Sequence, residues 1–339
     1  MRVLLISNMY PKEGSYSGIF IKHQVETIEK LGIDVIKAVK RTRNPSGYFP
    51  FIFQSIHKLL FCDYDIIHAH YVPHSALIPA MLKWIKKKPL IVTFHGDDAR
   101  IFPFKNRINR MLTMFVVNRS DKVIARSEEM KEVLEKLGVA NKKIVVLGAG
   151  VDTNLFHPMD KIKARKKLEL PVDKHIVLYV GRLHEMKGVK HIYECAERMP
   201  GVLFVMVGNG AVKTDVKNCL FAGEKKHEEI PLWMSAADIL ILPSYSEGLP
   251  NVVMEALSCG TPAIVTDVGG CPEVVRDGET GFVVHVGDVE ALTDRIKYLI
   301  KNEDLREKMG KLGREDMIQR YERGKVIGKL KEVYVYLIN

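Results

Sequence analysis

The sequence predicts an α/β fold built from two successive Rossmann-like domains, each with a parallel sheet between layers of helices. Three observations support this prediction. The chain has 339 residues, which exceeds the usual size of a single hydrophobic core. Short apolar runs alternate with longer amphipathic stretches almost from end to end, as in parallel sheets joined by helices. This alternation begins again after Pro158.

The strands of the first domain are expected where short runs of branched apolar residues occur, because such runs are typical of buried parallel strands. These runs occupy residues 2–7, 33–39, 65–69, 89–94, 122–126 and 143–147, with helical stretches between them such as 18–31 and 127–137. We expect this domain, residues 1–155, to be the acceptor side of the molecule and to carry its basic charge.

The second domain is expected over residues 156–320 and repeats the same pattern. Its strands are expected at 175–180, 202–207, 219–222, 238–242, 262–265 and 281–284, after a connection at 150–158 and a charged helix at 160–169. The residues after 320 show no further strand, so 321–339 are expected to form a helix that crosses back to the first domain. A ligand site between the two domains is the default expectation, because strand ends and helix N-termini converge there.

Composition narrows the class of protein. Apolar residues make up 47% of the chain and charged residues 27%, as in soluble globular proteins. No run of about 18 uncharged apolar residues occurs, so no membrane-spanning helix is expected. Five scattered cysteines without a CxxC pair indicate neither a disulfide framework nor a zinc site, and they fit a reducing cytoplasm.

The positive charge lies in the first half of the chain. Residues 1–150 contain 24 Lys and Arg against 13 Asp and Glu, a net charge of +11, whereas the remainder has a net charge of −1. Three segments in this half, 48–62, 79–90 and 100–119, mix large apolar with basic residues. They fit either core-facing helices with solvated basic faces or helices that rest on an anionic membrane or acceptor. No nucleic-acid partner is expected.

The most informative segment is 243–282, where Glu247 and Glu255 stand eight positions apart around a Gly-Leu-Pro turn. A helix is expected to begin near Asn251, so Glu255 lies about one turn into it. A helix N-terminus offers free N–H donors and a partial positive charge, which suit a diphosphate, and carboxylates beside it suit the hydroxyls of a ribose or sugar.

A second element, VGRLHEMKG at 180–188, places Arg182 and Lys187 after a strand. Two cations at a strand end can neutralise a diphosphate as a bond to it breaks. Gly208 follows the next strand in a GxG sequence that lacks the third glycine of a dinucleotide fingerprint, so it is read as a loop of close backbone approach.

In the first domain, a loop containing Gly14 and Gly18 leads from the first strand into a helix, and such loops let backbone N–H groups approach a phosphate or an acceptor. His95 follows the strand at 89–94 and can hydrogen-bond a hydroxyl. The nearby histidines 68, 70 and 74 have no carboxylate or cysteine that clearly completes a metal site, and no metal or other cofactor is predicted.

These motifs resemble, in order and over nearly the whole chain, those of the retaining glycosyltransferases of family 4, which have the GT-B architecture. The resemblance rests on segments such as PSYSEGLPNVVMEAL, VGRLHEMKG, TFHGDD and GVDTNLFHP. Two departures stand out: Gly14 and Gly18 are not adjacent, and Ala149 replaces an Asn that the family usually has.

The resemblance implies retaining, metal-independent transfer of a sugar from a UDP- or GDP-sugar to a glycan, lipid-linked or other hydroxyl acceptor. It implies a catalytic group of Glu247, His95, Arg182 and Lys187. It also implies donor contacts from Gly14, Gly18, Arg182, Lys187, Gly208, Glu247, Gly248, Leu249, Asn251 and Glu255. A cytoplasmic enzyme, peripheral at the inner membrane face, fits the basic first half.

Three alternatives remain at this point. A nucleotide-sugar 2-epimerase on the same architecture would turn over the donor without an acceptor. A glycoside hydrolase would use Glu247 and Glu255 as its carboxylate pair and would need no nucleotide. A catalytically silent binding protein is disfavoured by the intact acidic and basic residues.

Overall fold

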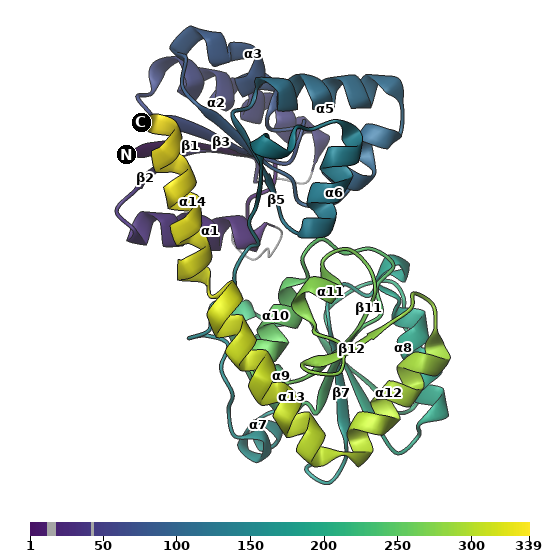
Figure 1. Ribbon diagram of the computed structural model, residues 1–339. Coiled ribbons are helices and arrows are strands. Elements are labelled where there is room, and N and C mark those ends of the chain that lie inside the picture. Colours follow the sequence, from purple (N-terminus) through teal and green to yellow (C-terminus); the bar gives the residue numbers. More distant parts are fainter. Residues whose placement is uncertain (12–17, 42–43) are drawn as a thin grey trace. The chain divides into compact units, whose positions relative to one another are not determined.

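A computed structural model describes residues 1–11, 18–41 and 44–339, and it divides the chain into two compact units. Unit 1 comprises Met1–Ala149 together with Gly324–Asn339, and unit 2 comprises Gly150–Arg323 (Figure 1). Each unit contains one six-stranded sheet in which every strand pair is parallel. The predicted α/β fold with two Rossmann-like domains is confirmed.

Unit 1 has the strand order β2-β1-β3-β4-β5-β6. Its strands are β1 (Arg2–Ser7), β2 (Asp34–Val39), β3 (Ile66–His70), β4 (Leu90–Thr93), β5 (Lys122–Ala125) and β6 (Ile144–Val146). Its helices are α1 (Ile19–Lys30), α2 (Tyr48–Phe61), α3 (Leu77–Lys86), α4 (Asp97–Arg100), α5 (Arg107–Arg119), α6 (Glu128–Leu137) and α14 (Arg323–Ile338), with short 3₁₀ turns at Pro45–Gly47, Phe102–Phe104 and Asn141–Lys143.

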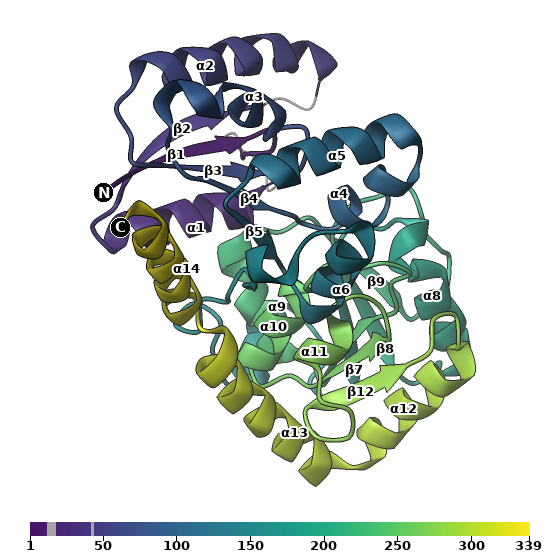
Figure 2. The same ribbon diagram turned by 45° about the horizontal axis from the view of Figure 1, so that its top comes forward.

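The alternation of side chains along β1 divides the core of unit 1 into two faces. Leu4 and Ile6 pack with residues of α2, α5 and α6, whereas Val3 packs with residues of α14 on the other face. Helix α1 lies on the same face as α14, and the Lys331 ammonium donates to the Leu31 carbonyl just beyond α1 (Figure 2). The last helix of the chain therefore completes the core of the unit formed by the first residues.

Unit 2 has the strand order β12-β11-β10-β7-β8-β9 and one continuous core. Its strands are β7 (Ile176–Val180), β8 (Leu203–Val207), β9 (Cys219–Gly223), β10 (Ile239–Leu242), β11 (Ala263–Thr266) and β12 (Gly281–Val284). Its helices are α7 (Lys161–Lys167), α8 (Val189–Arg198), α9 (Ile230–Ala236), α10 (Asn251–Ser258), α11 (Cys271–Val274), α12 (Val289–Lys301) and α13 (Glu303–Asp316), with 3₁₀ turns at Glu185–Lys187 and His227–Glu229 and a π turn at Met317–Tyr321.

No helix within the described ranges combines the length and the apolar character that crossing a membrane requires. Within each sheet all strands are parallel, so the loops after their carboxyl ends gather at one edge of that sheet. Most of the described residues singled out from the sequence lie in these loops, and Asn251 and Glu255 lie in the helix α10 that follows one of them.

Candidate functional site

The central pair of the site in unit 2 is Lys187 and Glu247, which come from loops after β7 and β10. The Lys187 Nζ lies 2.7 Å from Glu247 Oε1, and the Ser244 hydroxyl donates to the same carboxylate oxygen at 2.6 Å. Glu247 exposes only 12% of its side chain, so the ion pair is shielded from bulk water on that side. The structure thus brings together two residues that are 60 positions apart.

Arg182 leaves the end of β7 on the same side of the sheet. Its carbonyl oxygen accepts a hydrogen bond of 2.8 Å from the buried Tyr179 hydroxyl. Burial raises the pKa of Tyr179, the charge of Glu247 raises it further, and the charge of Arg182 lowers it. The charges of Glu247 and Arg182 are therefore both close enough to Tyr179 to affect its pKa. The Arg182 side chain is exposed and forms no hydrogen bond or ion pair with the residues that the structure describes, which leaves a cation available to a ligand.

Close backbone packing holds these loops together at two glycines. A Cβ on Gly188 would lie 1.8 Å from the Pro243 carbonyl oxygen, and a Cβ on Gly208 would lie 1.9 Å from the Gly181 carbonyl oxygen. Both glycines also have positive φ, of +65° and +141°. The sequence predicted close approach at Gly208, and the structure shows that its partner is the neighbouring loop of the protein itself.

Helix α10 begins at Asn251, as expected, with Pro250 as its N-cap and no side chain capping the terminus. Gly248 and Leu249 form the turn before it, and the Gly248 carbonyl accepts from the Gly270 N–H at 2.7 Å. The uncapped N–H groups of the first turn provide a site for negative charge.

Glu255 lies in this helix and is held by His227, a partner that the sequence did not predict for it. The His227 Nε2 lies 2.9 Å from Glu255 Oε1, and both side chains are mostly buried. Burial lowers the pKa of His227, but the hydrogen bond to Glu255 and its charge outweigh this effect, so the pKa lies above the ordinary value. The hydrogen bond between His227 and Glu255 is therefore strengthened by charge, and it fixes the orientation of the Glu255 carboxylate.

A second group of predicted residues lies in unit 1, at the carboxyl ends of β3 and β4. His95 Nε2 is 3.1 Å from Nδ1 of His70, and the His95 ring stacks on Tyr71 with ring centroids 4.3 Å apart. The backbone N–H groups of His95 and Gly96 both donate to the Asp98 carboxylate. The loop that carries His95 is thus fixed by its own backbone.

The charged groups around His95 are buried. Burial raises the pKa of Asp98 to about 6, which the backbone hydrogen bonds partly oppose. Burial lowers the pKa of Arg126 to about 10. Burial, with the charge of Arg126, holds the pKa of His95 well below its usual range, so the imidazole is neutral at neutral pH. Neither Asp98 nor Arg126 was singled out from the sequence. Asp98 lies three positions after His95, whereas Arg126 follows β5 and is brought near this histidine by the fold.

The metal interpretation of the first-domain histidines has no support from the geometry. His68 is fully buried and uses both ring nitrogens, one with the Tyr334 hydroxyl and one with Thr93. Within residues 1–11, 18–41 and 44–339, no cluster of three or more His, Cys, Asp and Glu side chains is arranged to hold a metal ion.

Gly18 is the remaining predicted residue of unit 1, and Gly14 lies outside the described residues. Gly18 has φ +79° and precedes α1, and its carbonyl accepts from the Ile21 N–H at 3.0 Å. A Cβ there would lie 2.9 Å from the Met9 carbonyl oxygen, so the start of α1 packs closely against the backbone just beyond β1.

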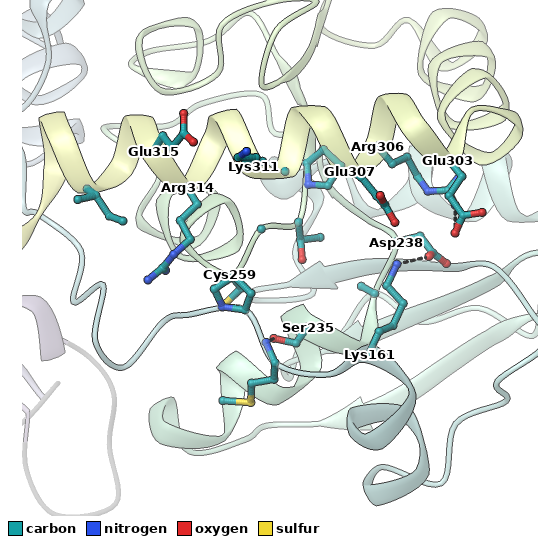
Figure 3. A pocket seen from close by; sticks show the side chains of 18 residues that line it. Lys161, Ser235, Asp238, Cys259, Glu303, Arg306, Glu307, Lys311, Arg314 and Glu315 are labelled. Atoms are coloured by element: carbon teal, nitrogen blue, oxygen red, sulfur yellow. Dashed lines mark hydrogen bonds and ion pairs between the residues drawn. The ribbon is translucent and has the colours of Figure 1, made fainter.

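A cavity of about 590 Å³ in unit 2 lies at the opposite edge of the sheet, next to the starts of β10 and β11 (Figure 3). Among the charged groups that line it, Lys161 pairs with Asp238, and the guanidinium of Arg314 on α13 donates to the carbonyls of Phe156 and Ser258. These contacts hold α13 against the unit. None of the predicted site residues lines this cavity.

Comparisons with known proteins identify the family of the chain. Residues 160–316 match the family described as Glycosyl transferases group 1, and residues 5–155 match Glycosyltransferase Family 4. The N-acetyl-alpha-D-glucosaminyl L-malate synthase of Bacillus anthracis is 26% identical over 80% of this chain and 74% of its own length. The D-inositol 3-phosphate glycosyltransferase of Mycobacterium tuberculosis is 30% identical over 70% of this chain and 54% of its own length.

Solved structures show the same fold. A sucrose-phosphate synthase from Thermosynechococcus elongatus has a TM-score of 0.83 at 21% identity, covering 99% of both chains. Anabaena HepE in complex with UDP has a TM-score of 0.82 at 20% identity, covering 99% of this chain and 100% of its own. The two family matches cover the two units in turn, and with the GT-B fold they show that this chain belongs to the group 1, family 4 glycosyltransferases.

Proposed function

We propose that this glycosyltransferase moves a sugar from a UDP- or GDP-sugar to a hydroxyl of a glycan or lipid-linked acceptor, with retention at the anomeric carbon. One observation carries the proposal: a Lys187–Glu247 ion pair lies in the loops beside the uncapped start of α10. A cation beside a helix N-terminus suits a diphosphate, and the adjacent carboxylate suits the hydroxyls of the sugar attached to it. Anabaena HepE, which shares the fold, was solved with UDP and with UDP-glucose, which supports a UDP-linked donor here.

In this proposal Arg182, Lys187 and the N–H groups around Asn251 stabilise the leaving diphosphate. Glu247 binds sugar hydroxyls and Glu255, oriented by His227, binds the ribose. Gly208, Gly248 and Leu249 shape the loops that carry these groups. From unit 1, His95 binds a sugar hydroxyl near the reacting carbon, and Gly18 at the start of α1 contacts the donor or acceptor. Gly14 is assigned the same role.

Retention follows, in this proposal, from transfer on one face of the sugar. The bond from the anomeric carbon to the diphosphate oxygen breaks, the acceptor oxygen bonds to the same face, and the leaving phosphate takes the acceptor's proton. Two protein cations supply the positive charge that developing negative charge requires. We therefore propose that the reaction needs no divalent metal.

The acceptor separates this proposal from the 2-epimerase alternative, because an epimerase would turn over the donor without any second substrate. A basic unit 1 favours an acceptor or surface that is anionic. We accordingly propose that the enzyme works in the cytoplasm, peripheral to the inner face of the membrane.

The decisive experiment incubates the purified chain with a panel of UDP- and GDP-sugars and measures release of UDP or GDP in the presence of EDTA. We expect one donor to be turned over, with the rate stimulated by a hydroxyl acceptor and unchanged by EDTA. Retention is read from the anomeric configuration of the product by NMR. A strict requirement for Mg²⁺ or Mn²⁺ would refute the role given to the two cations, and epimerised donor without acceptor would replace the transferase by the alternative.

A further inference from the structure

We infer that the outer faces of α2, α3 and α5 in unit 1 form a surface that docks on an anionic lipid bilayer. These three helices cover the same region of the sheet, and α2 and α5 contribute buried residues to one core cluster (Figure 1). The inference deepens the proposed function by naming the partner of the basic unit, and it rests on that function only for its biological consequence.

Helix α2 has two apolar stripes. Phe51, Ser55 and Leu59 are buried against the sheet. A second stripe beside it is exposed and has the helical spacing i, i+3, i+4, i+7: it consists of Phe49, Ile52, Phe53 and Ile56. Phe49 exposes 87% of its surface and Phe53 71%. A helix with an exposed apolar stripe as well as a buried one needs a second apolar environment beyond its own core.

The neighbouring helices continue this stripe. Met81, Trp84 and Ile85 are exposed on α3, and Ile108 and Met111 are exposed on α5. Trp84 exposes 68% of its surface, and an indole with one apolar and one polar edge suits the headgroup region of a bilayer. By contrast, α1 and α6 of the same unit expose no large hydrophobic residue. Helix α14 of this unit also exposes Val335, Tyr336 and Ile338, but α2, α3 and α5 together expose more large apolar residues.

Charge decides between a lipid surface and a neutral partner. The three helices contain six Lys and Arg (Lys58, Lys83, Lys86, Arg107, Arg110 and Arg119) and no Asp or Glu. The three arginines are exposed. The three lysines bond within the unit: Lys83 pairs with Asp121, and Lys58 and Lys86 donate to backbone carbonyls. Helix α6 instead has four Glu against two Lys. Exposed apolar side chains beside exposed arginines, on helices without Asp or Glu, are complementary to a surface that offers acyl chains beneath negative headgroups. Contact with anionic lipid would bring the enzyme to lipid-linked acceptors.

The test is sedimentation of the full chain with vesicles of phosphatidylcholine, with or without phosphatidylglycerol at about one third of the lipid. The wild type is expected to pellet with the anionic vesicles and to be released by high salt. The double variant Phe53→Ser/Trp84→Ser removes exposed rings only, so it folds, and its partition is expected to fall at least tenfold. Tyr336→Ser, which removes a similarly exposed ring (72%) on α14, is the matched control and should bind like the wild type.

Equal pelleting with neutral vesicles, or an unchanged partition of the double variant, would overturn the proposal. The proposal would also be overturned if the wild type were a dimer in analytical ultracentrifugation and the double variant a monomer. The surface would then bind a second copy of the chain. Donor turnover measured without vesicles should be equal in wild type and double variant. Because donor turnover and vesicle binding are read separately, the failure of one idea does not conceal the failure of the other.

A second inference concerns His95 and rests on a different observation. We infer that His70 positions His95 as the tautomer with its proton on Nδ1. The contact between His70 Nδ1 and His95 Nε2 can hold only one proton between two neutral rings. The remaining ring nitrogen of His70, Nε2, is buried and has no hydrogen-bond partner in the described part of the chain.

The two possible arrangements differ in what they leave at that buried nitrogen. If His95 donated, the proton of His70 would sit on Nε2 as a buried N–H without an acceptor, which proteins rarely tolerate. If His70 donates through Nδ1, only a lone pair is left there. The second arrangement leaves His95 with an Nδ1–H, so that it acts on the sugar as a hydrogen-bond donor. This inference depends on the role proposed for His95.

The tautomer can be read by ¹⁵N NMR on the chain labelled at histidine, without any substrate. We expect the Nδ1–H pattern for His95 in the wild type and in His70→Asn, whose amide donor replaces His70 Nδ1. We expect a mixture of tautomers in His70→Leu. In this variant kcat should fall by a larger factor than KM rises. An Nε2–H pattern in the wild type would show that His70 does not set the tautomer. So would a pure Nδ1–H pattern in His70→Leu, because the tautomer would then be unchanged without His70.

Discussion

Replacing Lys187 with alanine is expected to lower kcat/KM for donor turnover by roughly 10²–10³-fold, the usual effect of removing one preorganised donor from a developing oxyanion. The ammonium lies 2.7 Å from Glu247 and is 32% exposed, so it can approach a diphosphate while it is held in place. Its loss also leaves Glu247 without its cation, which repels a negatively charged donor. Both effects act in the same direction, and steady-state kinetics of nucleotide release measure their sum.

Lys190 provides the matched control for this experiment. It lies three residues further along, is 63% exposed and pairs with Glu185 rather than with a residue of the site. Lys190→Ala is expected to change kcat/KM by less than about twofold, as for an exposed ion pair. Equal losses in the two variants would mean that the positive charge of the loop acts at long range and that Lys187 has no particular role. A double-mutant cycle with Glu247→Gln then measures how much of the effect passes through the ion pair.

The residues of this site were predictable from the sequence because each follows a strand or begins a helix. The end of β7 gives Arg182 and Lys187, and the start of α10 gives Glu255, and both positions can be read from local patterns. What local patterns could not show are the partners. His227 is the clearest example, because it lies 28 positions before Glu255 and only the fold places it against that carboxylate. Ser244, in contrast, lies three positions before Glu247 in the same loop, so its contact is local.

Unit 1 illustrates the same limit. The alternation on β3 places His68 and His70 on one face, which was visible in the sequence, but the partner of His68 is Tyr334, which lies 266 positions away on the last helix. The segments 48–62, 79–90 and 100–119 allowed either a core or a surface role. The structure shows that α2 has both, with one apolar stripe buried and another exposed, because fourteen residues of helix carry more apolar side chains than one contact face can cover.

Replacing Gly188 with alanine is expected to destabilise the chain by about 3 kcal/mol or more and to reduce activity beyond the loss of folded protein. The left-handed conformation at φ +65° costs a residue with a Cβ about 1 kcal/mol. The larger part comes from the Pro243 carbonyl oxygen, 1.8 Å from where the Cβ would be, since backbone on both sides must move to relieve the overlap. Urea unfolding gives the free energy, and kcat/KM corrected for the folded fraction gives the effect on the site.

Gly201→Ala separates a general effect of adding a methyl group from this one. Gly201 has no atom within 4 Å of its added Cβ and no positive φ, so the substitution is expected to change stability by less than about 0.5 kcal/mol. Gly188 directly follows Lys187, and Pro243 directly precedes Ser244, which holds Glu247. Separating these two backbones therefore separates the ammonium from the carboxylate. If Gly188→Ala unfolds more easily but keeps the kcat/KM of the wild type per folded molecule, the distance between Lys187 and Glu247 does not matter for the reaction, and the role proposed for the pair is wrong.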